Sequence, residues 1–101
     1  MAEVIWAKRA VNQLERAVRY VAEERGNTYA KIVLERILNA AELLGQQPQL
    51  GFIEPLLVHR KYEYRSIVVW SYKIIYRCSS KQVIISRVFH TSRNPDKLKG
   101  V

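Results

Sequence analysis

The sequence has few of the residues that build disulfide-linked or metal-bound folds. Cys78 is the only cysteine among 101 residues, and there are two histidines. A single cysteine forms no disulfide within the chain, and neither a C-x-x-C pair nor an H-E-x-x-H motif occurs. A secreted disulfide scaffold and a structural zinc site are therefore excluded, and we expect no metal and no cofactor. The same cysteine usage predicts a reducing compartment, the cytoplasm.

Long apolar runs are also missing. No stretch reaches the roughly 18 apolar residues that a membrane-spanning helix needs, and Glu3, Lys8 and Arg9 interrupt the N-terminal segment. We therefore expect neither a membrane span nor an export signal. The apolar share of 49% excludes a disordered chain. At this length, one domain over residues 1–101 with its own core is expected.

What the chain has in excess is positive charge, and the excess lies in its second half. Residues 1–50 hold seven Lys and Arg against six acids, whereas residues 51–101 hold ten against three. A basic half of this kind suits a polyanion or an acidic protein partner. Simple solubility is the alternative explanation.

The apolar pattern predicts a strand, two helices and then three strands. Residues 2–7 are rich in strand formers, and an i, i+3, i+7 stripe over residues 9–25 ends at Gly26. Asn27 or Thr28 is expected to cap a second helix that stops at Gly45. Residues 46–55 are predicted to form a loop. Runs at residues 62–69, 72–78 and 82–89 predict an antiparallel meander, so the fold class is α+β with order β-α-α-β-β-β and a helix hairpin packed on an antiparallel sheet.

Strand parity assigns residues to sheet faces. A tight turn at Ser80-Lys81 predicts an apolar, helix-facing set of pairs, Cys78 with Val83, Tyr76 with Ile85, Ile74 with Arg87 and Tyr72 with Phe89. For the preceding hairpin, a three-residue loop would set Tyr64 opposite Tyr76 and Glu63 opposite Arg77. A two-residue loop would instead set Tyr64 opposite Arg77, and a one-residue slip exchanges the faces. We favour the three-residue loop because its cross-strand pairs are better matched.

The candidate site is a group of cations on the outer sheet face. The favoured register puts Arg65, Lys73 and Arg77 on one face, and His90 and Arg93 follow the last strand. Such a group can bind phosphates and stabilise charge on phosphorus, and His90 can transfer a proton near neutral pH. The alternative is a solvated or partner-covered basic face. Because exposed cations add little stability, we expect Arg65, Lys73 and Arg93 to be dispensable for folding.

Two other residues have simpler interpretations. Cys78 has apolar parity, so a buried, inert thiol is expected. Trp70 is expected to pack, or to anchor a partner from the tip of a loop.

With these elements assigned, the chain resembles toxins of the RelE/ParE superfamily. The similarity covers nearly the whole chain. It includes the opening strand with Trp6, the helix hairpin ending in Gln47-Pro48-Gln49-Leu50-Gly51, and the strand Tyr72-Lys73-Ile74-Ile75-Tyr76-Arg77. The closing segment, Val88 to Pro95, is similar to the R-V-x-H-x-x-R pattern of ParE-type members.

The resemblance implies the toxin of a type II toxin-antitoxin pair, held inactive in a prokaryotic cytoplasm by a cognate antitoxin whose extended segment wraps it. A toxin-antitoxin hetero-oligomer is the implied assembly. RelE-type members cut mRNA in the ribosomal A site with basic residues of the sheet face, often with a Tyr or His near the C-terminus. ParE-type members lack that set and inhibit DNA gyrase.

Two departures from the RelE pattern favour the interpretation that the chain is a ParE-like toxin. Arg65, Lys73 and Arg93 match cationic positions of RelE-type members, but Ile67 replaces a second strand Lys and no Tyr follows Arg93. We therefore expect a ParE-like gyrase inhibitor. A ribosome-dependent endoribonuclease acting on mRNA is the enzyme alternative, and a non-catalytic nucleic-acid-binding module is the third.

Overall fold

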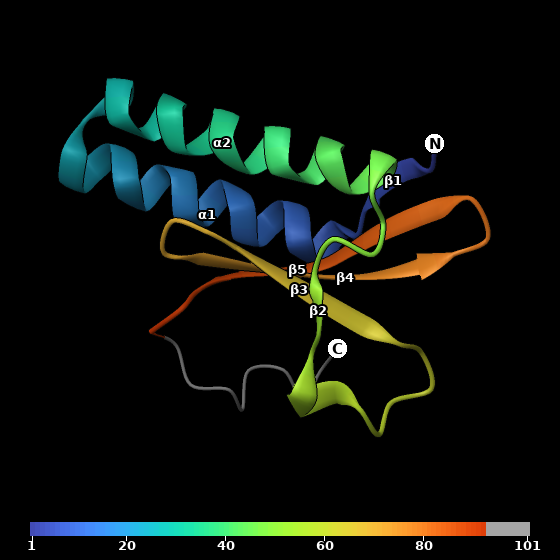
Figure 1. Ribbon diagram of the computed structural model, residues 1–101. Coiled ribbons are helices and arrows are strands. Elements are labelled where there is room, and N and C mark those ends of the chain that lie inside the picture. The colour runs from blue at the N-terminus through green and yellow to red at the C-terminus, as the bar shows by residue number, and fades with distance from the viewer. Residues whose placement is uncertain (93–101) are drawn as a thin grey trace.

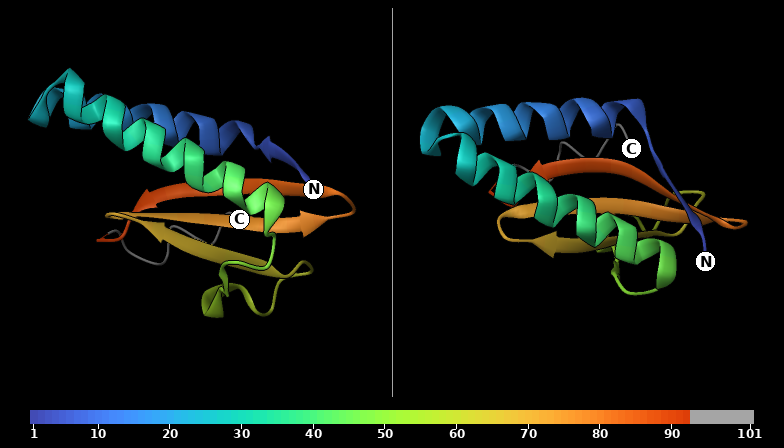
Figure 2. Two further views of the ribbon diagram at one scale, coloured as in Figure 1. Left: turned by 45° about the horizontal axis from the view of Figure 1, so that its top comes forward. Right: turned by 90° about the horizontal axis from the view of Figure 1, so that it is seen from above.

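The computed structural model describes residues 1–92, and in it a helix hairpin covers one face of a five-stranded sheet (Figure 1). The elements are β1 (Glu3–Trp6), α1 (Lys8–Arg25), α2 (Asn27–Gln46), β2 (Phe52–Ile53), the 3-10 helix η1 (Pro55–Leu57), β3 (Tyr64–Val69), β4 (Tyr72–Ser79) and β5 (Gln82–His90). The views in Figure 2 show both helices on the same side of the sheet. The predicted α+β class and the helix hairpin are confirmed.

The sheet is mixed rather than antiparallel throughout. Its order is β1-β5-β4-β3-β2, with β1 parallel to β5 and the other neighbours antiparallel. The helix hairpin separates β1 from the other strands in sequence, which leaves enough chain for β1 to run alongside β5 in the same direction. β4 and β5 therefore form the centre of the sheet and carry most of its buried side chains.

β2 was missing from the prediction. Phe52 and Ile53, in the segment predicted to be a loop, pair with Ser66 and Arg65 of β3. A two-residue strand has no readable alternation, and both of its side chains are exposed, Phe52 by 85%. Only contact with β3 defines it as a strand.

The helix hairpin forms because apolar side chains recur along one side of each helix. Leu14 and Val21 of α1 and Val33, Ile37 and Leu44 of α2 are buried in one core cluster with side chains of β4 and β5. Figure 1 shows the two helices side by side above the strands. None of the helices in residues 1–92 combines the length and the apolar character needed to cross a membrane.

The connection between the helices depends on Gly26 rather than on a capping side chain. Gly26 has φ +92°, a conformation that glycine adopts without strain. Its carbonyl accepts the Ala30 amide at 3.1 Å, and α2 begins at Asn27 with no side-chain cap. The expectation that Asn27 or Thr28 caps α2 is therefore wrong, because both residues already lie inside the helix.

The register of the β3–β4 hairpin is the alternative that we did not favour. Val69 pairs with Tyr72 around a two-residue turn, so Tyr64 faces Arg77 and Arg65 faces Tyr76. Trp70 adopts a left-handed backbone conformation in that turn, with φ 56°. Its ring lies 5.5 Å from the ring of Tyr29 on α2. The two-residue turn thus packs against α2 through Trp70. The cross-strand pairs alone had favoured a three-residue loop.

A β-bulge in β5 changes the predicted faces beyond residue 85. The pairs Cys78 with Val83 and Tyr76 with Ile85 are as predicted. The register then shifts, and the remaining pairs are Ile75 with Arg87, Ile74 with Val88, Lys73 with Phe89 and Tyr72 with His90. The predicted pairs of Arg87 with Ile74 and of Phe89 with Tyr72 are wrong because a bulge inserts one extra residue and inverts the alternation.

Candidate functional site

The outer face of the sheet, away from the helices, holds two of the predicted cations. Lys73 and Arg77 both lie on β4 with even spacing, so their side chains leave the same face. The guanidinium carbon of Arg77 lies 4.1 Å from the centre of the Tyr62 ring, a cation–π contact. Arg77 is therefore held against an aromatic surface while it remains partly exposed.

Lys73 is neutralised by a buried acid. Its Nζ lies 2.6 Å from Oε2 of Glu54, a residue that is only 1% exposed. The hydroxyl of Ser66 donates to the same oxygen at 2.9 Å, and the Leu56 amide donates to Oε1. Burial raises the pKa of Glu54, but the hydrogen bonds from Lys73 and Ser66 outweigh it, so the pKa lies below its ordinary value. Glu54 thereby fixes η1 to the outer face.

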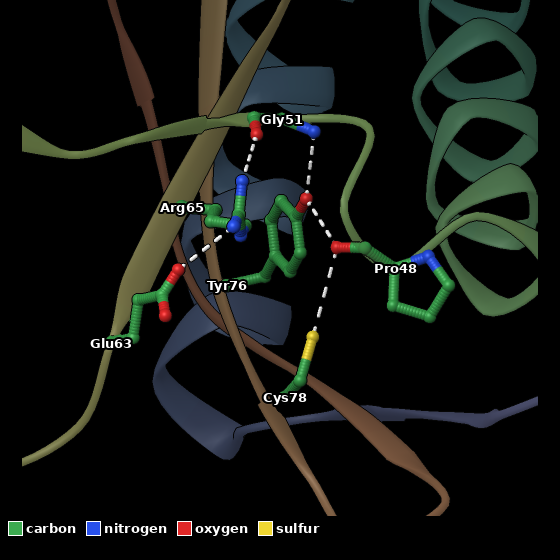
Figure 3. A network of polar contacts seen from close by, with 6 residues as sticks. All are labelled: Pro48, Gly51, Glu63, Arg65, Tyr76 and Cys78. Atoms are coloured by element: carbon green, nitrogen blue, oxygen red, sulfur yellow. Dashed lines mark hydrogen bonds and ion pairs between the residues drawn. The ribbon is translucent and has the colours of Figure 1, made fainter.

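Arg65 is on the opposite face from Lys73 and Arg77, which corrects the prediction that all three share one face. It stands directly across from Tyr76, whose ring is fully buried in the core beneath the helices. Its Nη1 donates to the Gly51 carbonyl at 2.8 Å, and its Nη2 lies 2.8 Å from a carboxylate oxygen of Glu63 (Figure 3). Glu63 therefore pairs with Arg65, not with Arg77 as the favoured register implied.

The loop after α2 is fastened to the sheet by the Tyr76 hydroxyl. This hydroxyl donates to the Pro48 carbonyl and accepts the Gly51 amide, each at 2.8 Å (Figure 3). Burial of the phenol raises the pKa of Tyr76, so it stays protonated and keeps both bonds. The Cys78 thiol makes a long contact of 3.7 Å to the same Pro48 carbonyl. Cys78 is exposed, contrary to the prediction, although desolvation still raises the pKa of its thiol.

His90 lies on the helix side, because the β5 bulge turns it away from Lys73 and Arg77. Its ring meets the ring of Tyr72 edge-on, with centres 5.4 Å apart. Nδ1 lies 2.7 Å from the Ser92 hydroxyl and accepts the Ser92 amide at 3.2 Å. The predicted grouping of His90 with the β4 cations is therefore wrong.

Arg87 is a further cation of the sheet, for which strand parity predicted a helix-facing position outside the candidate site. It lies on the outer face opposite Ile75 and is 4% exposed, and its Nε has no hydrogen-bond partner among residues 1–92. Desolvation is the main cause that lowers the pKa of Arg87, and the nearby positive charge of Arg9 lowers it further. A single Arg inside a run of β-branched residues was the one sequence signal that could have drawn attention to Arg87. The face on which Arg87 lies depends on the β5 bulge, which the sequence pattern does not show.

The described residues do not assemble the predicted cationic site. Lys73 and Arg77 share the outer face, Arg65 and His90 lie on the helix side, and Arg93 falls outside the described residues. Within residues 1–92, no three His, Cys, Asp or Glu side chains gather to hold a metal ion. Arg77 contacts the Tyr62 ring, whereas Arg65 and Lys73 are engaged in ion pairs with glutamates.

Comparison with known proteins adds two findings. Residues 4–95 match the family model described as ParE toxin of type II toxin-antitoxin system, parDE. The fold is similar to a solved chain of a chromosomal ParDE toxin-antitoxin system from P. aeruginosa, with a TM-score of 0.76 and 18% identity. That match covers 91% of this chain and 98% of the other. No curated protein matches.

Proposed function

This chain belongs to the ParE toxin family of type II toxin-antitoxin systems, and we propose that its target is DNA gyrase in the cytoplasm. Growth stops when gyrase is inhibited, and a cognate antitoxin, the partner that the family implies, restores growth by binding the toxin. The toxin acts by binding and needs no chemistry on RNA.

The observation that carries the proposal is the separation of the predicted cations. Cleavage of RNA requires several charged groups that converge on one phosphate and a residue that moves a proton. Arg65 and Lys73 project from opposite faces of the sheet, and each is paired with a glutamate at 2.8 and 2.6 Å. His90 lies on the helix side, where its Nδ1 is engaged by Ser92. These contacts support a binding surface over a ribonuclease centre.

A comparison of the two targets with purified components tests the proposal. The chain is incubated with gyrase and relaxed plasmid, and separately with ribosomes carrying a defined mRNA codon in the A site. We expect loss of supercoiling at a chain-to-gyrase ratio near one and intact mRNA. Efficient A-site cleavage that His90→Ala abolishes, with gyrase unaffected, would replace this proposal by the endoribonuclease.

Expression in cells gives an independent readout. The chain is placed under a tightly repressed promoter, and growth, chromosomal DNA integrity and mRNA integrity are followed after induction. We expect growth arrest with DNA breaks appearing before any change in mRNA. Unimpaired growth at high expression would contradict a functional toxin.

A further inference from the structure

A pocket of about 510 Å³ opens between α1 and the ends of β4 and β5, on the side of the sheet that carries the helices. α1 contributes Gln13, Arg16 and Tyr20 to its wall, and the strand ends contribute Tyr72 and His90. None of the cations of the outer face reaches it. The proposed gyrase inhibition uses none of these groups, so the pocket needs an explanation of its own.

The polar groups in the wall have fixed orientations. Because Nδ1 of His90 accepts the backbone amide of Ser92, the neutral ring carries its proton on Nε2. The edge-on contact with Tyr72, with an interplanar angle of 86°, holds the plane of that ring. Oε1 of Gln13 accepts the Val88 amide at 2.8 Å, so the amide nitrogen of Gln13 is left as a donor. The wall therefore offers preorganised donors.

The charge of the wall is positive. Among residues 1–92, Arg16 is the one Lys or Arg side chain that lines the pocket, and no carboxylate lines it. Donors beside a guanidinium favour an anion, and Arg presents its donors in a fork that matches a carboxylate. The rings of Tyr20 and Tyr72 supply apolar surface next to these donors, which suits a carboxylate carried by a peptide rather than a free inorganic ion.

We propose that this pocket binds an Asp or Glu side chain of the antitoxin, with its carboxylate held by Arg16 and His90 and an adjacent apolar residue against the tyrosine rings. The proposal rests on the proposed function, because the antitoxin is taken as the occupant. Charge complementarity supports an acidic partner segment, since the chain has a net charge of +8.

Two capped tetrapeptides that differ in one residue serve as the probes: acetylated, amidated Leu-Glu-Phe-Leu and the same peptide with Gln in place of Glu. Each is titrated to millimolar concentration into the full-length ¹⁵N-labelled chain, and amide shifts are followed by NMR. We expect saturable shifts at Gln13, Val88 and Ser92 with the Glu peptide. The Gln peptide should bind about tenfold more weakly, because a charged hydrogen bond is replaced by a neutral one.

Variants locate the binding site. Arg16→Gln and His90→Gln should each weaken binding of the Glu peptide by about tenfold. Arg19→Gln is the matched control, because Arg19 is an exposed cation of the same helix that does not line the pocket. The same spectra report whether each variant is folded. Equal affinity for the two peptides, unchanged binding in both pocket variants, or shifts confined to other surfaces would each overturn the proposal.

The pocket and the gyrase activity are measured separately. If the peptides fail to bind while the chain still inhibits gyrase, the pocket proposal alone is overturned. If the chain inhibits neither gyrase nor growth, the proposed function fails, whatever the peptides show.

Discussion

The Tyr76 hydroxyl and the Gly51 amide are joined by a 2.8 Å hydrogen bond across 25 residues of sequence. A Cβ added to Gly51 would lie 2.8 Å from that same hydroxyl oxygen and 2.6 Å from the backbone oxygen of Ser66. Gly51 is therefore a position of close approach between the loop and the sheet. Two of the sequence segments that carry the family resemblance, the one ending in Gly51 and the strand containing Tyr76, contact each other here.

The first prediction concerns this contact. Gly51→Ala should lower the free energy of unfolding by about 1–3 kcal/mol, because the backbone oxygen of Ser66 cannot move aside as a flexible side chain would. Tyr76→Phe should cost about 1–3 kcal/mol, since it leaves the Gly51 amide and the Pro48 carbonyl without their partner. Urea denaturation measures both. Wild-type stability in both variants would show that the loop is not fastened at this point.

The second prediction concerns Glu54 and Lys73. Because the pKa of Glu54 is lower in the folded chain than in the unfolded chain, its contribution to stability is complete above the unfolded value of about 4.3 and is lost as pH falls through the folded value. Glu54→Gln should remove that part of the acid dependence and destabilise the chain at neutral pH. Thermal melts from pH 7 down to pH 3 measure the effect. A parallel loss of stability in wild type and variant would contradict it.

The third prediction replaces the expectation that Arg65 and Lys73 are dispensable for folding. Arg65 is bonded to Gly51 and Glu63, and Lys73 is paired with a buried acid, so Arg65→Ala and Lys73→Ala should each lower the melting temperature. Lys73→Ala should be the more damaging, because it leaves the nearly inaccessible carboxylate of Glu54 uncompensated. Differential scanning calorimetry measures the order. Lys81→Ala, at an exposed turn, is the control.

The fourth prediction concerns Arg77, the partly exposed cation on the outer face. Arg77→Glu should weaken inhibition of gyrase by about tenfold while leaving the fold intact, because reversing a charge at the edge of an interface acts mainly on association. The supercoiling assay measures it, with Lys31→Glu on the exposed surface of α2 as the control. Equal inhibition by the two variants would place the target surface elsewhere.

The fifth prediction concerns the buried Arg87. The Arg87 guanidinium is desolvated, and its Nε has no partner among residues 1–92. Replacing it by an apolar chain of similar length removes a cost of burial, so Arg87→Met should keep or raise the stability. Arg87→Ala should lower it by leaving a cavity. Urea denaturation of the two variants separates these effects. A strongly destabilised Arg87→Met variant would indicate that the guanidinium makes an essential contact.

The amino-acid sequence by itself determined the two helices and the strands β1, β3, β4 and β5. The apolar stripe of α1 and α2, the glycine at residue 26 and the β-branched runs of β3, β4 and β5 are local patterns, and local backbone preferences produce local structure. The same patterns gave the fold class, because a helix hairpin and a sheet with one apolar face have to bury those surfaces against each other.

Only the tertiary structure decided which side chains meet. The two-residue turn at Trp70 and the bulge before Arg87 each shift the alternation by one residue, and a shift of one residue moves a side chain to the other face of the sheet. Arg65, Arg87 and His90 were misplaced for that reason. The partners Glu54 and Gly51 lie in a segment without periodicity, and only pairing of β2 with β3 brings them to Lys73 and Arg65. Cross-strand register depends on contacts between distant residues, which no local pattern encodes.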